Sequence, residues 1–164
     1  MGLREQYSRL KTIIKNNLKA ISDNFSLFRD SYSIFKTVKR IRSKKGELHF
    51  SRFSYFTCEY FSINKHYIAV SDNEKHEHDH PWNFLSFILK GSYTELSNGV
   101  LRHRKRFSIK YMKAVHQHRL YEVNGDYCLT FVITGRRFRE WGFPTENGWI
   151  ENTVYRKMKR NGEL

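Results

Sequence analysis

The sequence predicts a mainly β protein, an antiparallel sandwich or barrel of the jelly-roll kind that follows an α-helical N-terminal extension. Three observations predict it. After residue 46, short apolar runs alternate with turn signals, and Asn98-Gly99 and Asn124-Gly125 each separate two such runs, as in β-hairpins. Before that point, apolar residues recur every three to four positions, which is typical of helices. Aromatic residues form 16% of the 164 residues, which excludes a disordered chain because so much ring surface has to be buried.

Residues 1–45 are expected to form a basic extension of two helices. Ser22-Asp23-Asn24 supplies N-capping residues between them, and a second apolar period runs from Phe25 to Val38. The apolar stripe of the first helix indicates packing against the rest of the protein; the alternative is a basic amphipathic helix that binds anionic lipid or nucleic acid. This stripe consists of Leu3, Tyr7, Leu10, Ile13, Ile14, Leu18 and Ile21.

Residues 46–164 are expected to form the β-barrel domain. The pattern there consists of short apolar or alternating runs without intervening helical periods. Its last part, residues 144–164, is expected to run from a strand-like Trp149-Ile150 into a polar basic tail. The expected strands are Phe53–Ile63, Tyr67–Val70, Phe84–Leu89, Ser92–Leu96, Val100–Leu101, Phe107–Met112 and Cys128–Thr134.

The net charge of +14 raises the question of a nucleic-acid partner. Residues 1–45 hold 12 Lys and Arg against 3 Asp and Glu, whereas residues 46–164 hold 18 against 13. The charge therefore does not indicate nucleic-acid binding by the whole protein. Two Cys exclude a disulfide framework, no apolar run reaches the roughly 18 residues of a membrane span, and the N-terminus lacks a secretory signal. We expect a cytoplasmic protein without a membrane span.

Five of the eight His residues fall in two short windows, residues 76–80 and 116–118. Residues two apart in a strand point to the same side, so neighbouring histidines in each window can direct their imidazoles to one point. Two such ligands and a third from a neighbouring strand make a three-histidine face that leaves metal coordination positions open. A single pair at this spacing is also common on polar surfaces. Here the strongly apolar run Phe84–Leu89 follows the first window, which favours the mouth of a barrel.

The first window resembles the first motif of the cupin superfamily: Gly, five residues, His-x-His, three or four residues, Glu, six residues, Gly. His78 and His80 supply the pair, and Gly91 follows at the interval of the shorter form. The stretch HDHPWNFLSFILKGSYTE is also similar to a subgroup of small cupin-like proteins from bacteria and phages. The motif's Glu falls at Phe84 here, and only His118 of the second cupin motif is present.

The resemblance implies a cupin-like antiparallel jelly-roll barrel whose metal ligands are His78, His80 and His118. His76 and His116 are then interpreted as residues at the rim of the site. A facial set of three imidazoles suits Fe(II), Mn, Ni or Zn, and the sequence does not choose among these divalent ions.

Two classes of function follow from these observations. The first is a metal-dependent cupin of the oxygenase or isomerase type that acts on a small anionic molecule, with Arg119 and Arg137 as substrate-binding candidates because guanidinium groups bind carboxylate or phosphate. No catalytic residue is assigned, and the nearest titratable side chains are Tyr93, Glu95 and Glu140. The second is a non-catalytic binding module whose basic N-terminal helices contact nucleic acid or a protein partner. A homodimer is a further expectation, since cupins commonly associate through sheet edges.

Overall fold

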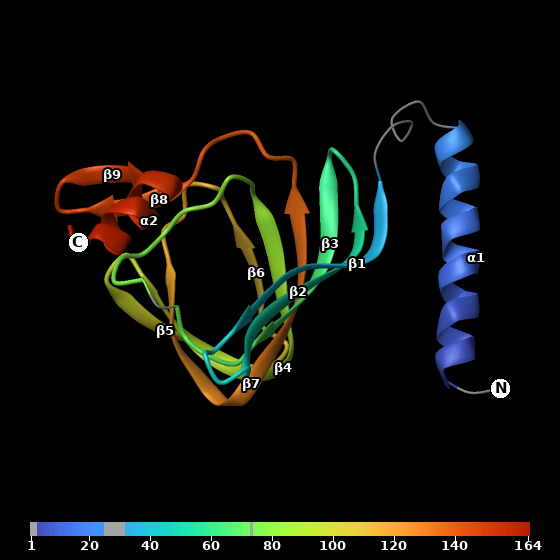
Figure 1. Cartoon of the computed structure of the whole chain (residues 1–164), viewed down its shortest axis with the longest axis horizontal. Coiled ribbons are helices and arrows are strands. Elements are labelled where there is room, and N and C mark those ends of the chain that lie inside the picture. Colours follow the sequence, from blue (N-terminus) through green and yellow to red (C-terminus); the bar gives the residue numbers. More distant parts are fainter. Residues whose placement is uncertain (1–2, 25–31, 73) are drawn as a thin grey trace.

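The computed structural model describes residues 3–24, 32–72 and 74–164. Most of the described chain forms antiparallel strands, with a helix toward each end (Figure 1), which confirms the prediction of a mainly β protein with an N-terminal helix. The elements in chain order are α1 (Leu3–Asn24), β1 (Ser33–Arg42), β2 (Leu48–Thr57), β3 (Phe61–Ile68), β4 (Phe84–Ser97), β5 (Val100–Arg104), β6 (Ile109–Met112), β7 (Arg119–Gly135), β8 (Gly142–Thr145), β9 (Gly148–Glu151) and α2 (Asn152–Asn161).

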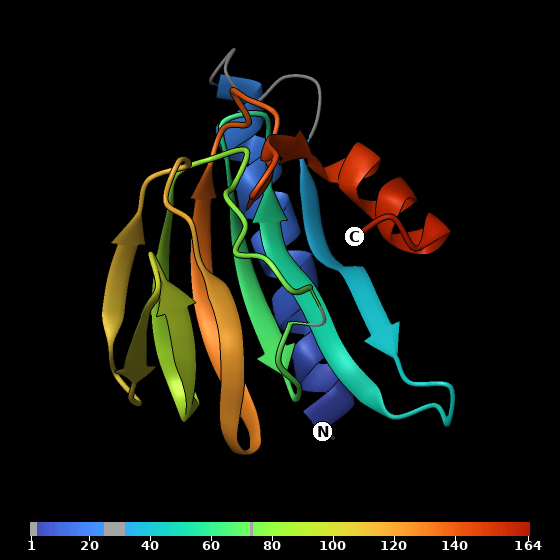
Figure 2. The same cartoon turned by 90° about the vertical axis from the view of Figure 1, so that its left-hand side faces the viewer.

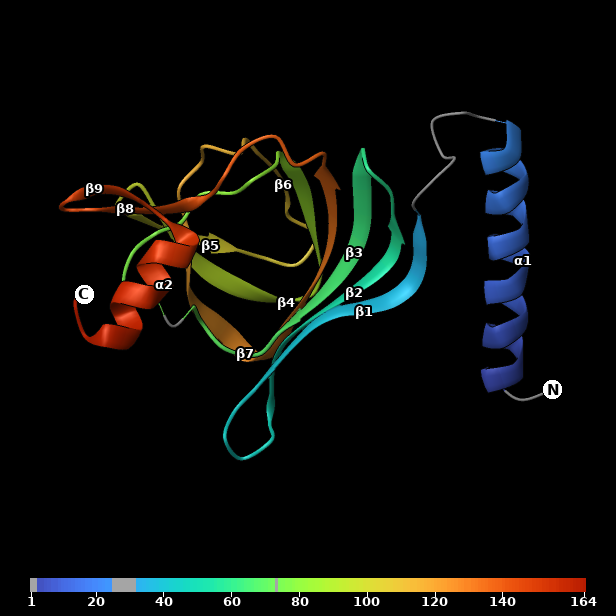
Figure 3. The same cartoon turned by 45° about the horizontal axis from the view of Figure 1, so that its top comes forward.

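Strands β1 to β7 form one curved sheet in the order β1-β2-β3-β7-β4-β5, with β6 paired to β4. Its pairings are antiparallel throughout. Figure 3 shows the sheet curling around an interior, with the β8–β9 hairpin and α2 on the side opposite to α1. This curvature turns alternate side chains of β2, β3, β4 and β7 toward a common interior.

A corner in β4 and β7 produces much of the curvature. Gly91 has a φ of +74°, and a Cβ at this position would lie 2.3 Å from the carbonyl oxygen of Tyr127. The register of the two strands shifts on both sides of Gly91, and Figure 1 shows β7 bending at its foot. The hairpin expected at Asn124-Gly125 is therefore wrong, because β7 continues through both residues and Gly125 adopts a positive φ in the bend. The hairpin expected at Asn98-Gly99 is confirmed between β4 and β5.

The second N-terminal helix is wrong from Ser33 onward, because Ser33–Arg42 forms strand β1. The part of that predicted helix in residues 25–31 lies outside the described residues. β1 pairs with β2, so the sheet includes residues on both sides of the predicted domain boundary at residue 45. Phe35 lies 6.4 Å from Phe53 and 6.2 Å from Tyr55 between ring centroids, and such cross-strand aromatic contacts favour the strand.

The first predicted helix is confirmed as α1, but the described chain covers little of its apolar stripe. Tyr7, Leu10 and Ile13 keep 52%, 54% and 51% of their surface exposed. A ring contact of 6.0 Å between the centroids of Tyr7 and Phe35 links the helix to β1. Close packing of the stripe on the barrel is therefore wrong for these three residues. Among the described residues, no helix combines the length and the apolar character that crossing a bilayer requires.

The C-terminal residues are more regular than the sequence predicts. β8 and β9 form a hairpin, and α2 replaces the expected polar tail (Figure 2). The Glu151 side chain caps α2 by accepting hydrogen bonds from the backbone N–H groups of Thr153 and Val154. Tyr155 is the buried residue of this helix, and its ring stacks on that of Phe143 at 3.8 Å. The apolar residues Tyr155 and Met158 do lie three positions apart, as in a helix, but they are few in a segment rich in Lys and Arg, which is why the sequence suggests a polar tail.

The inner face of the curved sheet borders a cavity of about 670 Å³. Two small groups of buried side chains, around Phe84 and around Ile88, form the packed part of the interior. The cavity wall combines apolar side chains with His, Arg and Lys residues and two carboxylates, those of Asp72 and Glu74. Cavities of this volume and mixed lining are typical of small-molecule sites.

Candidate metal centre

Three imidazoles converge in the wall of the cavity, those of His78, His80 and His118. Their candidate ligand nitrogens all lie within 4.8 Å of one another. His78 and His118 face each other in an isolated antiparallel bridge, with N···O distances of 2.8 and 3.0 Å. The His80 N–H donates to the carbonyl of Ala114 at 2.8 Å and fixes the same segment two residues later. The structure thus brings together the three histidines that the cupin resemblance selects.

Asp79, between the two histidines of the pair, points to the other side of the segment and is 2% exposed. Its carboxylate accepts hydrogen bonds from Nη1 of Arg139 at 2.7 Å, the backbone N–H of Gly142 at 2.7 Å and the indole N–H of Trp149 at 3.0 Å. These contacts fasten the histidine segment to the β8–β9 hairpin. The pair does not open a regular strand, because the chain bends at residues 81–82 and β4 begins only at Phe84.

The environment keeps the imidazoles of His78 and His80 uncharged at neutral pH. Burial, followed by the proximity of His118, lowers the pKa of His78 to about 4. Burial and then the other two histidines lower the pKa of His80 well below its ordinary value. A neutral imidazole keeps a nitrogen lone pair for a metal ion, whereas a protonated one does not. The Nε2 atoms of His80 and His118 lie 2.8 Å apart, so a ring nitrogen of His118 adjoins that of His80.

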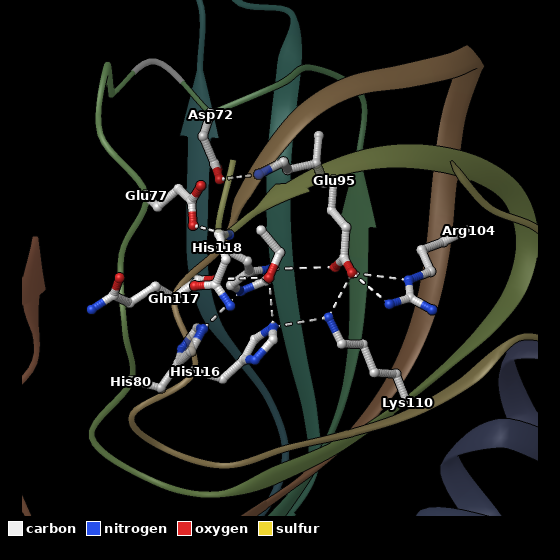
Figure 4. A network of polar contacts seen from close by, with 12 residues as sticks. Asp72, Glu77, His80, Glu95, Arg104, Lys110, His116, Gln117 and His118 are labelled. Atoms are coloured by element: carbon white, nitrogen blue, oxygen red, sulfur yellow. Dashed lines mark hydrogen bonds and ion pairs between the residues drawn. The ribbon is translucent and has the colours of Figure 1, made fainter. Parts of the chain in front are cut away.

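Glu95 lies on the other side of the His118 ring (Figure 4). Its Oε2 is 3.5 Å from Nδ1 of His118, and neither atom has a closer polar partner in the described part of the chain. The imidazole therefore directs Nδ1 at a carboxylate and Nε2 at His80. In metal sites, a carboxylate in this position fixes the orientation of the ring and increases the basicity of the ligand nitrogen.

Two cations hold the second oxygen of this carboxylate. Oε1 of Glu95 accepts hydrogen bonds from Arg104 at 2.7 and 2.9 Å and from Lys110 at 2.5 Å, and the residue has no exposed surface. Burial alone would raise the pKa of Glu95, but the adjacent His118 imidazole and the hydrogen bonds from Lys110 and Arg104 outweigh it and hold the pKa well below its usual range. Glu95 therefore stays ionised, and we interpret it as a positioning residue rather than a free acid or base.

The other two titratable candidates lie in different surroundings. Tyr93 lines the cavity, and burial raises the pKa of its phenol, so Tyr93 keeps its proton at neutral pH. Glu140 is exposed and forms an ion pair with Arg137. Arg119 donates hydrogen bonds to the backbone carbonyls of Glu74 and Lys75. Neither Arg119 nor Arg137 is among the described residues of the cavity wall, and their role in substrate binding stays a prediction.

The remaining histidines of the two windows have partners of their own. Nδ1 of His76 contacts the hydroxyl of Tyr155 at 2.9 Å. Nε2 of His116 contacts the hydroxyl of Ser97 at 3.0 Å and Nζ of Lys110 at 3.2 Å. Within the described residues, both lie outside the three-histidine cluster.

Sequence reasoning missed Arg52 and His66, which also line the cavity. Their strands have the alternating pattern that usually places polar residues outside. The only available signal was their place among aromatic residues in the strands Leu48–Thr57 and Phe61–Ile68. A sequence does not show that a barrel interior is hollow, so inward-facing polar residues read as exposed ones.

Comparison with solved structures identifies the fold. The chain matches a cupin-2 domain from Rhodospirillum rubrum with a TM-score of 0.53 and 11% identity, over 84% of this chain and 90% of that one. It matches FeII HppE with a TM-score of 0.50 and 8% identity over 61% of this chain, and it spans only 56% of that protein. No family model and no curated protein matches the sequence. The chain has the cupin jelly-roll fold, which confirms the predicted fold class.

Proposed function

We propose that this chain is a metal-dependent cupin in which His78, His80 and His118 bind a divalent ion and the adjacent cavity binds a small anionic molecule. The observation that carries the proposal is the convergence of three partly buried imidazoles in the wall of a cavity. Fe, Mn, Ni or Zn is the ion expected for such a donor set. When bound, the ion supplies a Lewis acid or a redox centre, and an oxygenase or isomerase is the class of activity we expect.

The residues present fit a metal ion. Two imidazole nitrogens 2.8 Å apart need either a shared proton or a shared cation, and the third imidazole lies beside them. The lone contact of the His118 Nδ1 atom with Glu95 has the geometry by which carboxylates support ligand histidines. Three nitrogen donors leave further coordination positions for a ligand from the cavity.

Aromatic side chains pack against two of the histidines at this end of the cavity. The ring of His78 packs against Trp141 at 5.8 Å and Phe143 at 5.9 Å, and that of His80 packs against Phe84 at 4.7 Å. These contacts restrict imidazole motion and lower the local dielectric constant, which strengthens electrostatic interactions with a bound anion. The protonated phenol of Tyr93 is part of the same wall and adds a hydrogen-bond donor.

Metal analysis of the purified full-length protein tests the proposal. We expect about one first-row metal ion per chain, and we expect His78→Ala, His80→Ala and His118→Ala each to lose most of it because two imidazoles alone bind weakly. His103→Ala is the matched control, since His103 is exposed on β5 and should leave the metal content unchanged.

Two results would contradict the metal site. One is a protein that takes up none of Fe(II), Mn, Ni or Zn when each is supplied in excess. The other is a folded His80→Ala variant that keeps the metal content of the unmodified chain.

A second candidate function is nucleic-acid binding by α1, and the exposed basic face of that helix favours it. Lys11, Lys15 and Lys19 follow one another at intervals of four residues and are exposed. Contacts with phosphate make such binding fall steeply with salt. In a gel-shift assay, we expect the full chain to bind at low salt and a variant with all three lysines changed to Gln to bind more weakly. Absence of binding at low salt, or equal binding by the variant, would contradict this function.

A further inference from the structure

A row of polar residues crosses the inner face of the sheet. Lys39 pairs with Arg52, Arg52 with His66, and His66 with Thr130, across β1, β2, β3 and β7. All four residues line the cavity. The row therefore adds hydrogen-bond donors to a wall that otherwise includes many apolar side chains.

Arg52 is a partly buried cation in this row, and it lacks a carboxylate partner. Its Nε donates a hydrogen bond to Nε2 of His66 at 3.1 Å, and its guanidinium lies 5.9 Å from the ring centroid of Trp82. Within residues 3–24, 32–72 and 74–164, no ion pair joins Arg52 to an Asp or Glu side chain. Buried charges are ordinarily paired, so this guanidinium lacks the counterion that its position calls for.

His66 orients the guanidinium without neutralising it. Burial, followed by the positive charges of Arg52 and Lys39, lowers the pKa of His66 to about 3, so its imidazole is neutral and accepts the hydrogen bond. This contact uses Nε of Arg52 and leaves Nη1 and Nη2 without an acceptor among the described residues. The terminal N–H groups of a guanidinium match the paired oxygens of a carboxylate or a phosphate.

Two further cations line the cavity where the chain is exposed. Burial lowers the pKa of Lys39, Arg156 and Arg52 lower it further, and Glu74 and Asp72 raise it. Glu74 and Asp72 also line the cavity, so these two carboxylates offset part of the positive charge around Lys39 and Arg156. Neither carboxylate forms an ion pair with Arg52 in the described chain. Positive charge that lines a cleft in this way attracts anions into it.

We propose that Arg52, oriented by His66, binds the oxyanion of a small organic acid, either a carboxylate or a phosphate ester. The apolar body of the ligand fills the cavity toward the three histidines, against a wall that includes Phe50, Ile68, Trp82, Met112 and Val132. A volume of about 670 Å³ admits a ligand of this kind. The inference extends the proposed function. It rests on that function for the metal site, which the end of the ligand farther from Arg52 contacts. It assigns anion binding to β2 and β3 rather than to Arg119 and Arg137.

Calorimetric titration of the EDTA-treated full-length protein tests the anion site. The probes are benzoate, phenyl phosphate and the uncharged benzamide. We expect at least one of the two anions to bind about tenfold or more tightly than benzamide, because only an oxyanion pairs with the guanidinium. Binding of benzoate alone identifies a carboxylate site, and binding of phenyl phosphate alone identifies a phosphate site. Absence of binding by both anions, or equal binding of benzamide, would overturn the proposal.

The Arg52→Gln substitution should lower the affinity for whichever anion binds by about tenfold or more, since it removes the charge and the paired donors. Arg40→Gln is the matched control, because Arg40 is exposed on the neighbouring strand β1 and should leave the affinity unchanged. Equal affinity in Arg52→Gln and the unmodified chain would overturn the proposal.

A measurement on the unmodified chain covers the case in which Arg52→Gln does not fold. We expect the anion, but not benzamide, to shift the imidazole NMR signals of His66, because His66 shares a hydrogen bond with Arg52. Unchanged His66 signals at saturating anion would overturn the proposal.

These experiments separate the anion site from the metal site. EDTA-treated protein and the His80→Ala variant should still bind the anion, since neither change touches Arg52 or His66. Binding of the anion without binding of metal would support the anion site and contradict the proposed metal-dependent function. Binding of metal without binding of either anion would contradict only the anion site at Arg52.

Discussion

Glu95 has no exposed surface, and its two oxygens serve different parts of the molecule. One oxygen accepts hydrogen bonds from Arg104 on β5 and Lys110 on β6, and the other faces Nδ1 of His118. The same carboxylate therefore balances charge between two strands and orients a candidate metal ligand. Removing the charge of Glu95 should therefore affect both the charge balance and the orientation of His118.

We expect Glu95→Gln to lower metal affinity by about 10- to 100-fold, which is typical of the loss of a carboxylate behind a ligand histidine. The variant also leaves two cations without their anion, so its free energy of unfolding should fall as well. Competition with a chelator measures the affinity, and urea unfolding measures the stability. Glu122→Gln, on an exposed position of β7, is the matched control. Unchanged metal affinity in a folded Glu95→Gln protein would contradict the positioning role.

His66 gives a pH dependence of stability whose sign follows from its pKa. The pKa is about 3 in the folded chain, whereas an unfolded His has a pKa near 6.5. Between these values the unfolded chain binds a proton that the folded chain does not, so the free energy of unfolding falls as the pH falls. The loss is up to about 1.4 kcal/mol per pH unit for each such group.

Urea unfolding at pH 7, 5.5 and 4 tests this dependence. His66→Gln should lose less stability between pH 7 and pH 4 than the unmodified chain, because Gln does not titrate. His103→Gln, at an exposed position, should keep the full dependence. Parallel pH profiles for His66→Gln and the unmodified chain would show that His66 is not buried in its neutral form.

Sequence reasoning located residues whose chemistry is local and missed those whose chemistry depends on assembly. The spacing of His78 and His80 points both imidazoles to one side, and the cupin resemblance added His118. Arg52 and His66 are 14 residues apart on different strands, and only the pairing of β2 with β3 shows that they touch. The role of Glu95 likewise depends on strands β5 and β6 that no motif connects to it.

At the level of elements, two glycines show how differently the same backbone conformation can constrain the chain. Gly91 and Gly99 have φ values of +74° and +72°. Around Gly99 no atom lies within 4 Å of an added Cβ, whereas at Gly91 the Tyr127 carbonyl oxygen lies 2.3 Å from it. The first glycine forms the corner of the barrel, and the second only forms a hairpin turn.

We therefore expect Gly99→Ala to cost about 1 kcal/mol of unfolding free energy, from the positive φ alone. Gly91→Ala should cost about 3 kcal/mol or more, because the corner between β4 and β7 has to open as well. Urea unfolding of both variants measures the difference. Equal losses would show that β4 and β7 do not approach closely at Gly91.

The strand β1 shows why element type was harder to predict than fold class. Aromatic residues at positions 25, 28, 32 and 35 fit a helical period, and a strand needs only alternation over a shorter range. The contacts that decide, from Phe35 to Phe53 and Tyr55, join residues about 20 positions apart. The number of strands and turns after residue 46 was sufficient for the fold class, since most of the sheet lies there.

At the scale of the whole molecule, metal binding should raise the free energy of unfolding and the melting temperature. An ion that binds only the folded chain adds about 2.7 kcal/mol to the free energy of unfolding at a concentration 100 times its dissociation constant. For a chain of this length, EDTA should then lower the melting temperature by about 5 to 10 °C. The His80→Ala variant should melt at the same temperature with and without EDTA. A melting temperature of the unmodified chain that changes with neither added metal nor EDTA would contradict the metal site.

The hydrogen bonds of Asp79 also set the order in which the protein can be completed during its synthesis. A nascent chain that has reached Leu120 already contains all three clustered histidines. Asp79 lies between His78 and His80, and the hydrogen-bond donors to its carboxylate come from Arg139, Gly142 and Trp149, which are translated later. The histidine segment is therefore fastened in place only after the ribosome has translated Trp149. We therefore expect the proposed metal ion to bind after this point in synthesis, and not when the three histidines first leave the ribosome.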